Sequence, residues 1–193
     1  MKPMSQMWHR ARYFALRLIE DRSGLAAIEF AMIVPIMLVM FFGVVEFSSA
    51  VAVDRKVTLM ARTLSDLTSQ SASVGDADMT NFFAASVGIM TPYDSAPVKS
   101  TITELYIDPT THAARVQWSK GSFPRGTSTI VTIPTDLAVG GTYVIFSEVS
   151  YLYTPAVGYL IAKAGITLSD VSYTRPRQST CVFYGSDTAC KTL

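Results

Sequence analysis

The sequence predicts an α+β protein in which a long N-terminal transmembrane helix continues beyond the membrane and packs on a small antiparallel sheet domain. An apolar run of twenty residues at 26–45 is long enough to cross a bilayer. An apolar stripe with helical period follows it, and from about residue 100 the apolar period changes to two, as in β-strands. We therefore expect a leader at 1–24, a helix at 25–70 and an α+β domain at 71–193.

The leader is basic, and this predicts the orientation of the chain. It has five Lys and Arg residues against two acidic ones, whereas the rest of the chain has 11 basic and 13 acidic residues. Basic flanks of a membrane span stay in the cytoplasm, so the C-terminal domain should lie outside it. Within the leader, residues 8–20 suit either a short helix on the membrane surface or a loosely ordered basic flank.

The predicted span reads AAIEFAMIVPIMLVMFFGVV, and Glu29 is its only charged residue. Twenty helical residues cover about 30 Å, which is the thickness of the hydrocarbon core. Pro35 and Gly43 would break a soluble helix but are tolerated in membrane helices, where Pro35 is expected to kink the axis. The run therefore predicts one membrane-spanning helix.

The helix should extend beyond the membrane to about residue 70. Apolar residues recur there at spacings of four and three, on one face: Val53, Val57, Met60, Leu64 and Leu67. Charged residues occupy the other faces, and no Gly or Pro interrupts before Gly75. The stripe either packs only on the protein's own domain or also faces neighbouring subunits.

The remaining residues predict a small α+β domain. A loop at 69–78 and a short helix at 77–90 precede four strands, at 100–108, 113–119, 128–134 and 142–153. The last strand is apolar on both faces, which predicts an interior strand on which the long helix packs. The segment 156–168 is apolar but short and broken by Gly158, Lys163 and Gly165, so no second span is expected.

Cys181 and Cys190 are the only cysteines. Outside the cytoplasm, a disulfide is the expected state of such a pair. A metal site is the rival interpretation, but it needs further ligands. His9 lies in the leader and His112 is the only other histidine, so we expect a disulfide and no metal.

The sequence does not predict an enzyme. It contains no nucleophile elbow, no dinucleotide-binding glycine pattern and no phosphate-binding loop. His112 lies in a predicted turn, and Asp76 and Asp78 lack the glutamate that would close a calcium loop. The body has no basic patch, which argues against nucleic-acid binding. We expect no cofactor.

Glu29 leaves three interpretations of the N-terminus. A charge inside a membrane helix costs roughly 2.5–3.5 kcal/mol on insertion scales. In a plain signal anchor, Glu29 would lower this cost by snorkelling from near the helix end. A cleaved secretory signal would be cut near Ala52, but the apolar run is long for one and Glu46 follows it. The third interpretation is a processing and assembly signal at 24–30.

The third interpretation is favoured by a family resemblance. Gly24-Leu-Ala-Ala-Ile-Glu29-Phe30, behind a basic leader, resembles the type IV prepilin signal. The resemblance implies that a membrane aspartyl peptidase, the prepilin peptidase, cuts after Gly24. Leu25 would become the first residue of the mature chain and Glu29 the fifth. The new α-amine of one subunit would then pair with the Glu29 carboxylate of another.

Two further patterns narrow the resemblance. The helix contains Ala27-x-Glu29-Phe30-Ala31, then Pro35, then Gly43-x-x-Glu46-Phe47. The tail contains Tyr151-x-Tyr153-x-Pro155 and, later, the run SYTRPR at 172–177. Both are similar to TadE-type proteins, the minor pseudopilins of tight-adherence (Tad/Flp) pilus systems. TadF shares the signal, and TadG-type proteins have a much longer body, so the short body here favours TadE.

The resemblance implies a non-enzymatic role in pilus assembly. The expected partners are the prepilin peptidase, Flp-type pilins, other minor pseudopilins, the inner-membrane assembly platform and the lipid bilayer. The chain would cross the bacterial inner membrane once, with its C-terminus in the periplasm, and could enter an extracellular pilus. Pro35 and Gly43 would serve helix kinking or packing. The alternative from another class is a periplasmic binding or sensor domain on a signal anchor.

Overall fold

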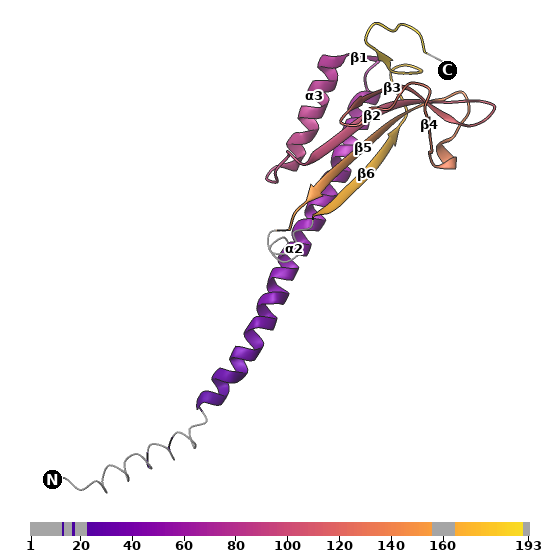
Figure 1. Cartoon of the computed structure of the whole chain (residues 1–193). Coiled ribbons are helices and arrows are strands. Elements are labelled where there is room, and N and C mark those ends of the chain that lie inside the picture. The colour runs from indigo at the N-terminus through magenta and orange to yellow at the C-terminus, as the bar shows by residue number, and fades with distance from the viewer. Residues whose placement is uncertain (1–12, 14–16, 18–22, 156–164, 191–193) are drawn as a thin grey trace, which may run out of the picture. The chain divides into compact units, whose positions relative to one another are not determined.

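The computed structural model describes residues 13, 17, 23–155 and 165–190. The chain divides into two compact units, Met1–Val45 and Glu46–Leu193. Helix α2, Ser23–Ser69, runs through the boundary, and the second unit holds a five-stranded antiparallel sheet (Figure 1). The predicted α+β class is confirmed. Most of 8–20, and residues 156–164 of the apolar segment at 156–168, lie outside the described residues.

The sheet has the strand order β4-β3-β2-β5-β6. The strands are β2 Val98–Ile107, β3 Ala114–Gly121, β4 Ile130–Val131, β5 Tyr143–Tyr153 and β6 Ile166–Thr174. β5 lies between β2 and β6, so the prediction of an interior strand is confirmed.

The prediction of four strands was wrong because β6 is the fifth. Its apolar and polar residues do not alternate, since it is an edge strand with polar side chains on both faces. Its pairing comes from the backbone ladder with β5, and its far end is held by hydroxyl groups. Ser65 of α2 lies 2.9 Å from the Ser172 hydroxyl and accepts a hydrogen bond from Thr174 at 3.0 Å. Conversely, the predicted strand at 128–134 is reduced to the two residues of β4.

The predicted loop at 69–78 contains a short strand, β1 Ser73–Val74. It pairs in parallel with β7, Phe183–Tyr184, near the end of the chain. Helix α3, Asp76–Val87, follows, and a 3-10 helix, η1 Gly88–Met90, extends it. A second 3-10 helix, η2 Thr135–Leu137, precedes β5. The β1–β7 pairing could not be expected from a Ser-rich break, because it depends on a distant partner strand.

The apolar stripe of the outer part of α2 forms the core of the second unit. Four of its five predicted residues are fully buried, namely Val53, Val57, Met60 and Leu64, and Leu67 is half-buried. The four fully buried residues form one cluster with Ile102 of β2 and with Ile145 and Val149 of β5. Full burial of each such side chain is worth about 1.5–3 kcal/mol. The stripe therefore packs on the protein's own sheet, as one of the two interpretations expected.

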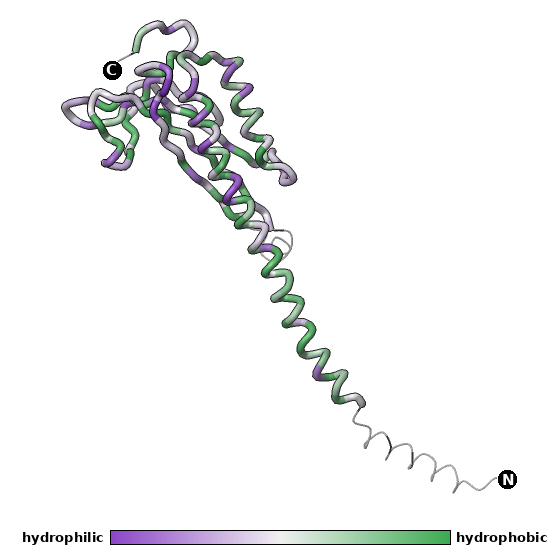
Figure 2. The backbone as a smooth tube through the Cα atoms, turned by 180° about the vertical axis from the view of Figure 1, so that it is seen from behind, coloured by the Kyte–Doolittle hydropathy of each residue, from purple (hydrophilic) through white to green (hydrophobic). Residues whose placement is uncertain are grey.

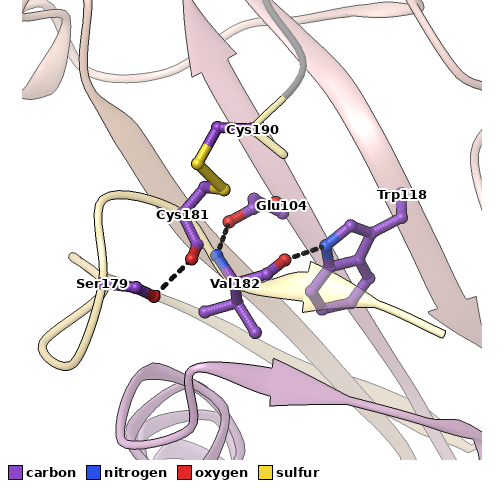
Figure 3. The surroundings of a disulfide bond; sticks show 6 residues. All are labelled: Glu104, Trp118, Ser179, Cys181, Val182 and Cys190. Atoms are coloured by element: carbon purple, nitrogen blue, oxygen red, sulfur yellow. Dashed lines mark hydrogen bonds between the residues drawn. A yellow bond between two sulfur atoms is a disulfide. The ribbon is translucent and has the colours of Figure 1, made fainter. Parts of the chain in front are cut away.

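The C-terminal tail is fixed by a disulfide and by two hydrogen bonds to one residue. Cys181 and Cys190 form the predicted disulfide (Figure 3). Val182, which follows Cys181, is fully buried. Its N–H donates a hydrogen bond to the Glu104 carboxylate, and its carbonyl accepts one from the Trp118 indole N–H at 2.8 Å. Glu104 and Trp118 face each other across β2 and β3, so their side chains lie on one face. The tail thus closes over this face of the sheet.

Glu104 is a buried acid that accepts its hydrogen bond from an uncharged backbone N–H, that of Val182. Only 2% of it is exposed, and burial raises its pKa to about 8, while the Val182 N–H acts in the opposite direction. Below about pH 8 the folded protein therefore holds Glu104 protonated, whereas the unfolded chain loses this proton near pH 4.5. Stability from this residue is greatest below the unfolded pKa and falls as the pH rises towards 8.

Replacing Glu104→Gln should remove this pH dependence. The amide oxygen can still accept from Val182, and no charge has to be buried at high pH. We expect wild-type protein to lose roughly 2–5 kcal/mol more than the variant between pH 5 and pH 8.5. Urea unfolding of the detergent-solubilised full chain at the two pH values measures this. Asp54→Asn, at an exposed acid of α2, is the matched control; equal pH dependence of Glu104→Gln and wild type would contradict the assignment.

Replacing both cysteines by serine should destabilise the tail. The disulfide closes a loop with a sequence separation of 9 residues. In the chain-entropy model, a loop of this size is worth about 2–3 kcal/mol. Urea unfolding of the double variant should match that of wild-type protein kept reduced. A double variant as stable as the oxidised wild type would show that the hydrogen bonds to Val182 alone hold the tail.

Candidate functional site: the apolar helix and its boundary

The part of α2 in the first unit exposes apolar side chains along its length, and Figure 2 colours most of it as hydrophobic. Phe30 is 69% exposed and Met40 67%, and of residues 24–45 only Val34 is even half-buried. By length and composition, Gly24–Ser69 is the one helix in the described part of the chain that could cross a membrane. A surface of this kind is unfavourable in water and fits a membrane anchor.

The predicted processing and assembly residues lie in the first turns of this helix. Gly24 is the second residue of α2, and Leu25 and Glu29, four residues apart, lie on one helix face with a rise of about 6 Å between them. Glu29 and Phe30 are both exposed. The described residues give Glu29 no hydrogen bond or ion pair within this chain.

The two glycines of this segment are not required by the chain's own packing. A Cβ added at Gly24 or at Gly43 would meet nothing within 4 Å. Pro35 lies inside the helix, which continues through it. The small size of Gly24 and Gly43 therefore has to be explained by something outside the chain, or by membrane-helix composition alone.

Glu46 lies where the second unit begins and is held by the end of β5. The Tyr153 hydroxyl donates to the Glu46 carboxylate at 3.1 Å and lies 3.5 Å from its carbonyl oxygen. Burial, followed by the hydrogen bond to Glu46, raises the pKa of Tyr153, so its hydroxyl remains a donor at neutral pH. Glu46 and Tyr153 are 107 residues apart and belong to the two separate patterns of the sequence. The structure brings these patterns together.

The other polar residues considered from the sequence have structural contacts. Asp76 accepts hydrogen bonds from Tyr184 and from Lys120, the latter at 3.3 Å, and Asp78 accepts from the Gly75 N–H at the start of α3. The His112 ring lies 3.0 Å from the Ala138 carbonyl. Within residues 23–155 and 165–190, no group of three or more His, Cys, Asp or Glu side chains is placed to hold a metal.

A shallow groove on the sheet face away from α2 was not expected from the sequence. It has a volume of about 330 Å³, and its lining includes Lys99, Phe123 and Val171. Arg125 and Glu148, which also line it, form a bidentate ion pair with one distance of 2.8 Å. The two charges therefore neutralise each other, and the ion pair does not indicate a site for a charged ligand.

The comparison with known protein families gives a match to the helix and none to the sheet domain. Residues 24–65 match the TadE family model, whose description is TadE-like protein. No curated protein and no solved structure matches the chain. The matched residues run from the predicted processing site, through the exposed apolar segment, to Ser65, which follows Leu64 of the buried stripe, so the predicted resemblance is confirmed there. Over residues 24–65, which include its N-terminal apolar segment, this chain is similar to the TadE-like family.

Proposed function

We propose that this protein is a minor pseudopilin of the TadE type, which takes part in assembly of a Tad/Flp-type pilus after cleavage behind Gly24. The observation that carries the proposal is the family match to residues 24–65, whose first part, 24–45, is an exposed apolar helix with Glu29 near its start. The protein would sit in the bacterial inner membrane with its leader in the cytoplasm and its sheet domain in the periplasm. Its role there is structural.

Cleavage would change the charge at the start of the helix. The prepilin peptidase removes the basic leader and leaves the α-amine of Leu25 at the membrane surface. Gly24 is exposed, and a Cβ added there would meet nothing within 4 Å. The helix N-terminus already carries a partial positive charge, and the new amine adds a full one.

Glu29 would then set the position of neighbouring subunits. A carboxylate in hydrocarbon is costly, and its own chain offers it no partner among the described residues. The amine of another subunit can supply one if that helix is shifted along its axis by about 6 Å, the rise from Leu25 to Glu29. Such a pair fixes register more than it adds stability, because both charges lose water.

Assembly requires the helix to exchange lipid for protein contacts. The exposed segment 24–45 would leave the bilayer at the assembly platform and pack against helices of Flp-type pilins and of other minor pseudopilins. Close approach of helices in such contacts favours small residues, and Gly43 offers open backbone at its position. Pro35 would let the axis bend during the transfer.

Gly24→Ala should slow cleavage, since the added methyl group lies at the bond to be cut. The full chain is co-expressed with a prepilin peptidase, and the intact mass of the membrane-extracted protein is measured. Wild type should begin at Leu25, and the variant should largely retain the leader. Gly43→Ala is the matched control, because a Cβ there is equally unhindered. Retention of Met1 in the wild type would contradict the proposal and favour an anchored binding or sensor domain.

Glu29→Ala should leave cleavage intact but impair assembly. The substitution makes the span more apolar, so membrane insertion is not weakened. Loss of one partner of a buried pair costs about 3–5 kcal/mol, which corresponds to well over a tenfold loss of assembled pili. Pili are counted by electron microscopy, with Met32→Ala in the same exposed segment as control. Normal pilus numbers with Glu29→Ala would show that the carboxylate does not register subunits.

A further inference from the structure

Two buried polar side chains line the same small cavity beneath the C-terminal tail. The ladder between β2 and β3 shifts by one residue at Glu104, and Gln117 is the extra residue of the resulting β-bulge. Both side chains are buried, and the cavity that they share has a volume of about 10 Å³. Its other walls include Trp118 and the disulfide of the tail (Figure 3).

The side-chain oxygen of Gln117 needs a hydrogen-bond donor. The Nε2 atom of Gln117 donates to the Arg115 carbonyl at 3.3 Å, so the amide oxygen is directed the other way. None of the N–H and hydroxyl groups in the described part of the chain donates to this buried Oε1 atom. A buried amide oxygen without a donor is unfavourable, and in a native fold such an atom requires an explanation.

Glu104 has a proton that needs an acceptor. One of its carboxyl oxygens accepts from the Val182 N–H, and burial raises the pKa of the group to about 8, so the carboxyl is protonated at neutral pH. A protonated carboxyl is also a donor. The Gln117 oxygen in the same cavity can accept this proton. Since about 10 Å³ is the lower limit for holding a water molecule, a direct bond is favoured over a bridging water.

The ionisable groups around the cavity favour the neutral carboxyl. Of the described residues that line it none is basic, whereas the acid Asp187 and the phenol of Tyr184 do line it. Lys120 lies over the Tyr184 ring, but it is paired with Asp76. Tyr143 of β5 interacts electrostatically with the carboxyl, and burial raises the pKa of both tyrosines above the usual value of 10.0. Neither tyrosine therefore titrates together with the carboxyl.

We propose that Glu104 and Gln117 form a proton-dependent latch that holds the C-terminal tail closed. With its proton in place, the carboxyl accepts from Val182 through one oxygen and donates to Gln117 through the other. When the proton passes to hydroxide in the solvent, a carboxylate oxygen faces the amide oxygen with no donor between them, and the new charge is buried. Hydration of the carboxylate then requires the tail to move away. The latch lies within the second unit and does not depend on pilus assembly.

The tail should therefore open as the pH rises. In the closed state Glu104 keeps its proton up to about pH 8, whereas an exposed carboxyl loses it near pH 4.5. Between these values opening of the tail releases one proton, so the open fraction rises by up to about tenfold for each pH unit. Above the pKa of the closed state, both states are deprotonated and the open fraction becomes constant.

Hydrogen exchange of the Val182 amide tests the latch, because this N–H bonds to Glu104. The detergent-solubilised full chain, with its disulfide formed, is measured from pH 5.5 to pH 9.5 by mass spectrometry with fragmentation to single residues. Protection factors, which remove the intrinsic pH dependence of exchange, should fall by about tenfold per pH unit and level off near pH 8. The amides of β5 should be more protected at every pH, since only the tail opens.

Gln117→Met supplies the variant that separates the latch from burial alone. Methionine fills a similar volume but cannot accept the proton, so the pH at which the profile levels off should fall by about one unit. Gln178→Met, at an exposed glutamine of the tail, is the matched control and should keep the wild-type profile. Glu104→Gln has no proton to lose, so its protection factors should not depend on pH.

Three results would overturn the proposal. The first is a protection factor of Val182 that does not change with pH in the wild type. The second is a Gln117→Met profile that levels off at the wild-type pH or above it, because the amide would then not hold the proton. The third is exchange of Val182 as slow as that of the β5 amides, because the whole unit rather than the tail would then open.

Discussion

The packing of the outer part of α2 against β2 and β5 is the contact on which the rest of the second unit depends. Val57, Met60 and Leu64 are fully buried there and give the sheet its core on one face. The buried Ser147 hydroxyl donates to the Ala61 carbonyl and joins β5 to the helix at mid-length. Without this contact, the fully buried side chains of the sheet would face water, at about 25 cal/mol for each Å².

The parts of the fold that periodicity describes could be predicted, and the parts that depend on distant partners could not. The stripe in α2 and strands β2, β3 and β5 have regular apolar spacing, because each has a face in the core. Strand β6 is polar on both faces, and β1 exists only because β7 returns to it. The disulfide was expected from the two cysteines and the predicted compartment, but the burial of Glu104 beneath the tail had no local signal.

The candidate site shows the same division. The positions of Gly24, Glu29 and Pro35 along one helix could be read directly from the sequence. The contact between Glu46 and Tyr153 could not, since 107 residues separate them and neither has a spacing that indicates the other. The family match covers the pattern in the helix and not the one in the tail, so the contact between them comes from the structure alone.

The packing of the outer part of α2 along the sheet has a mechanical consequence. Within the second unit, a pull along the axis of α2 loads the helix–sheet contact in shear. Shear is shared by several buried side chains and by the hydrogen bonds of Ser65 to β6 at the same time. A pull on the outer part of α2 is therefore shared among several contacts with the sheet.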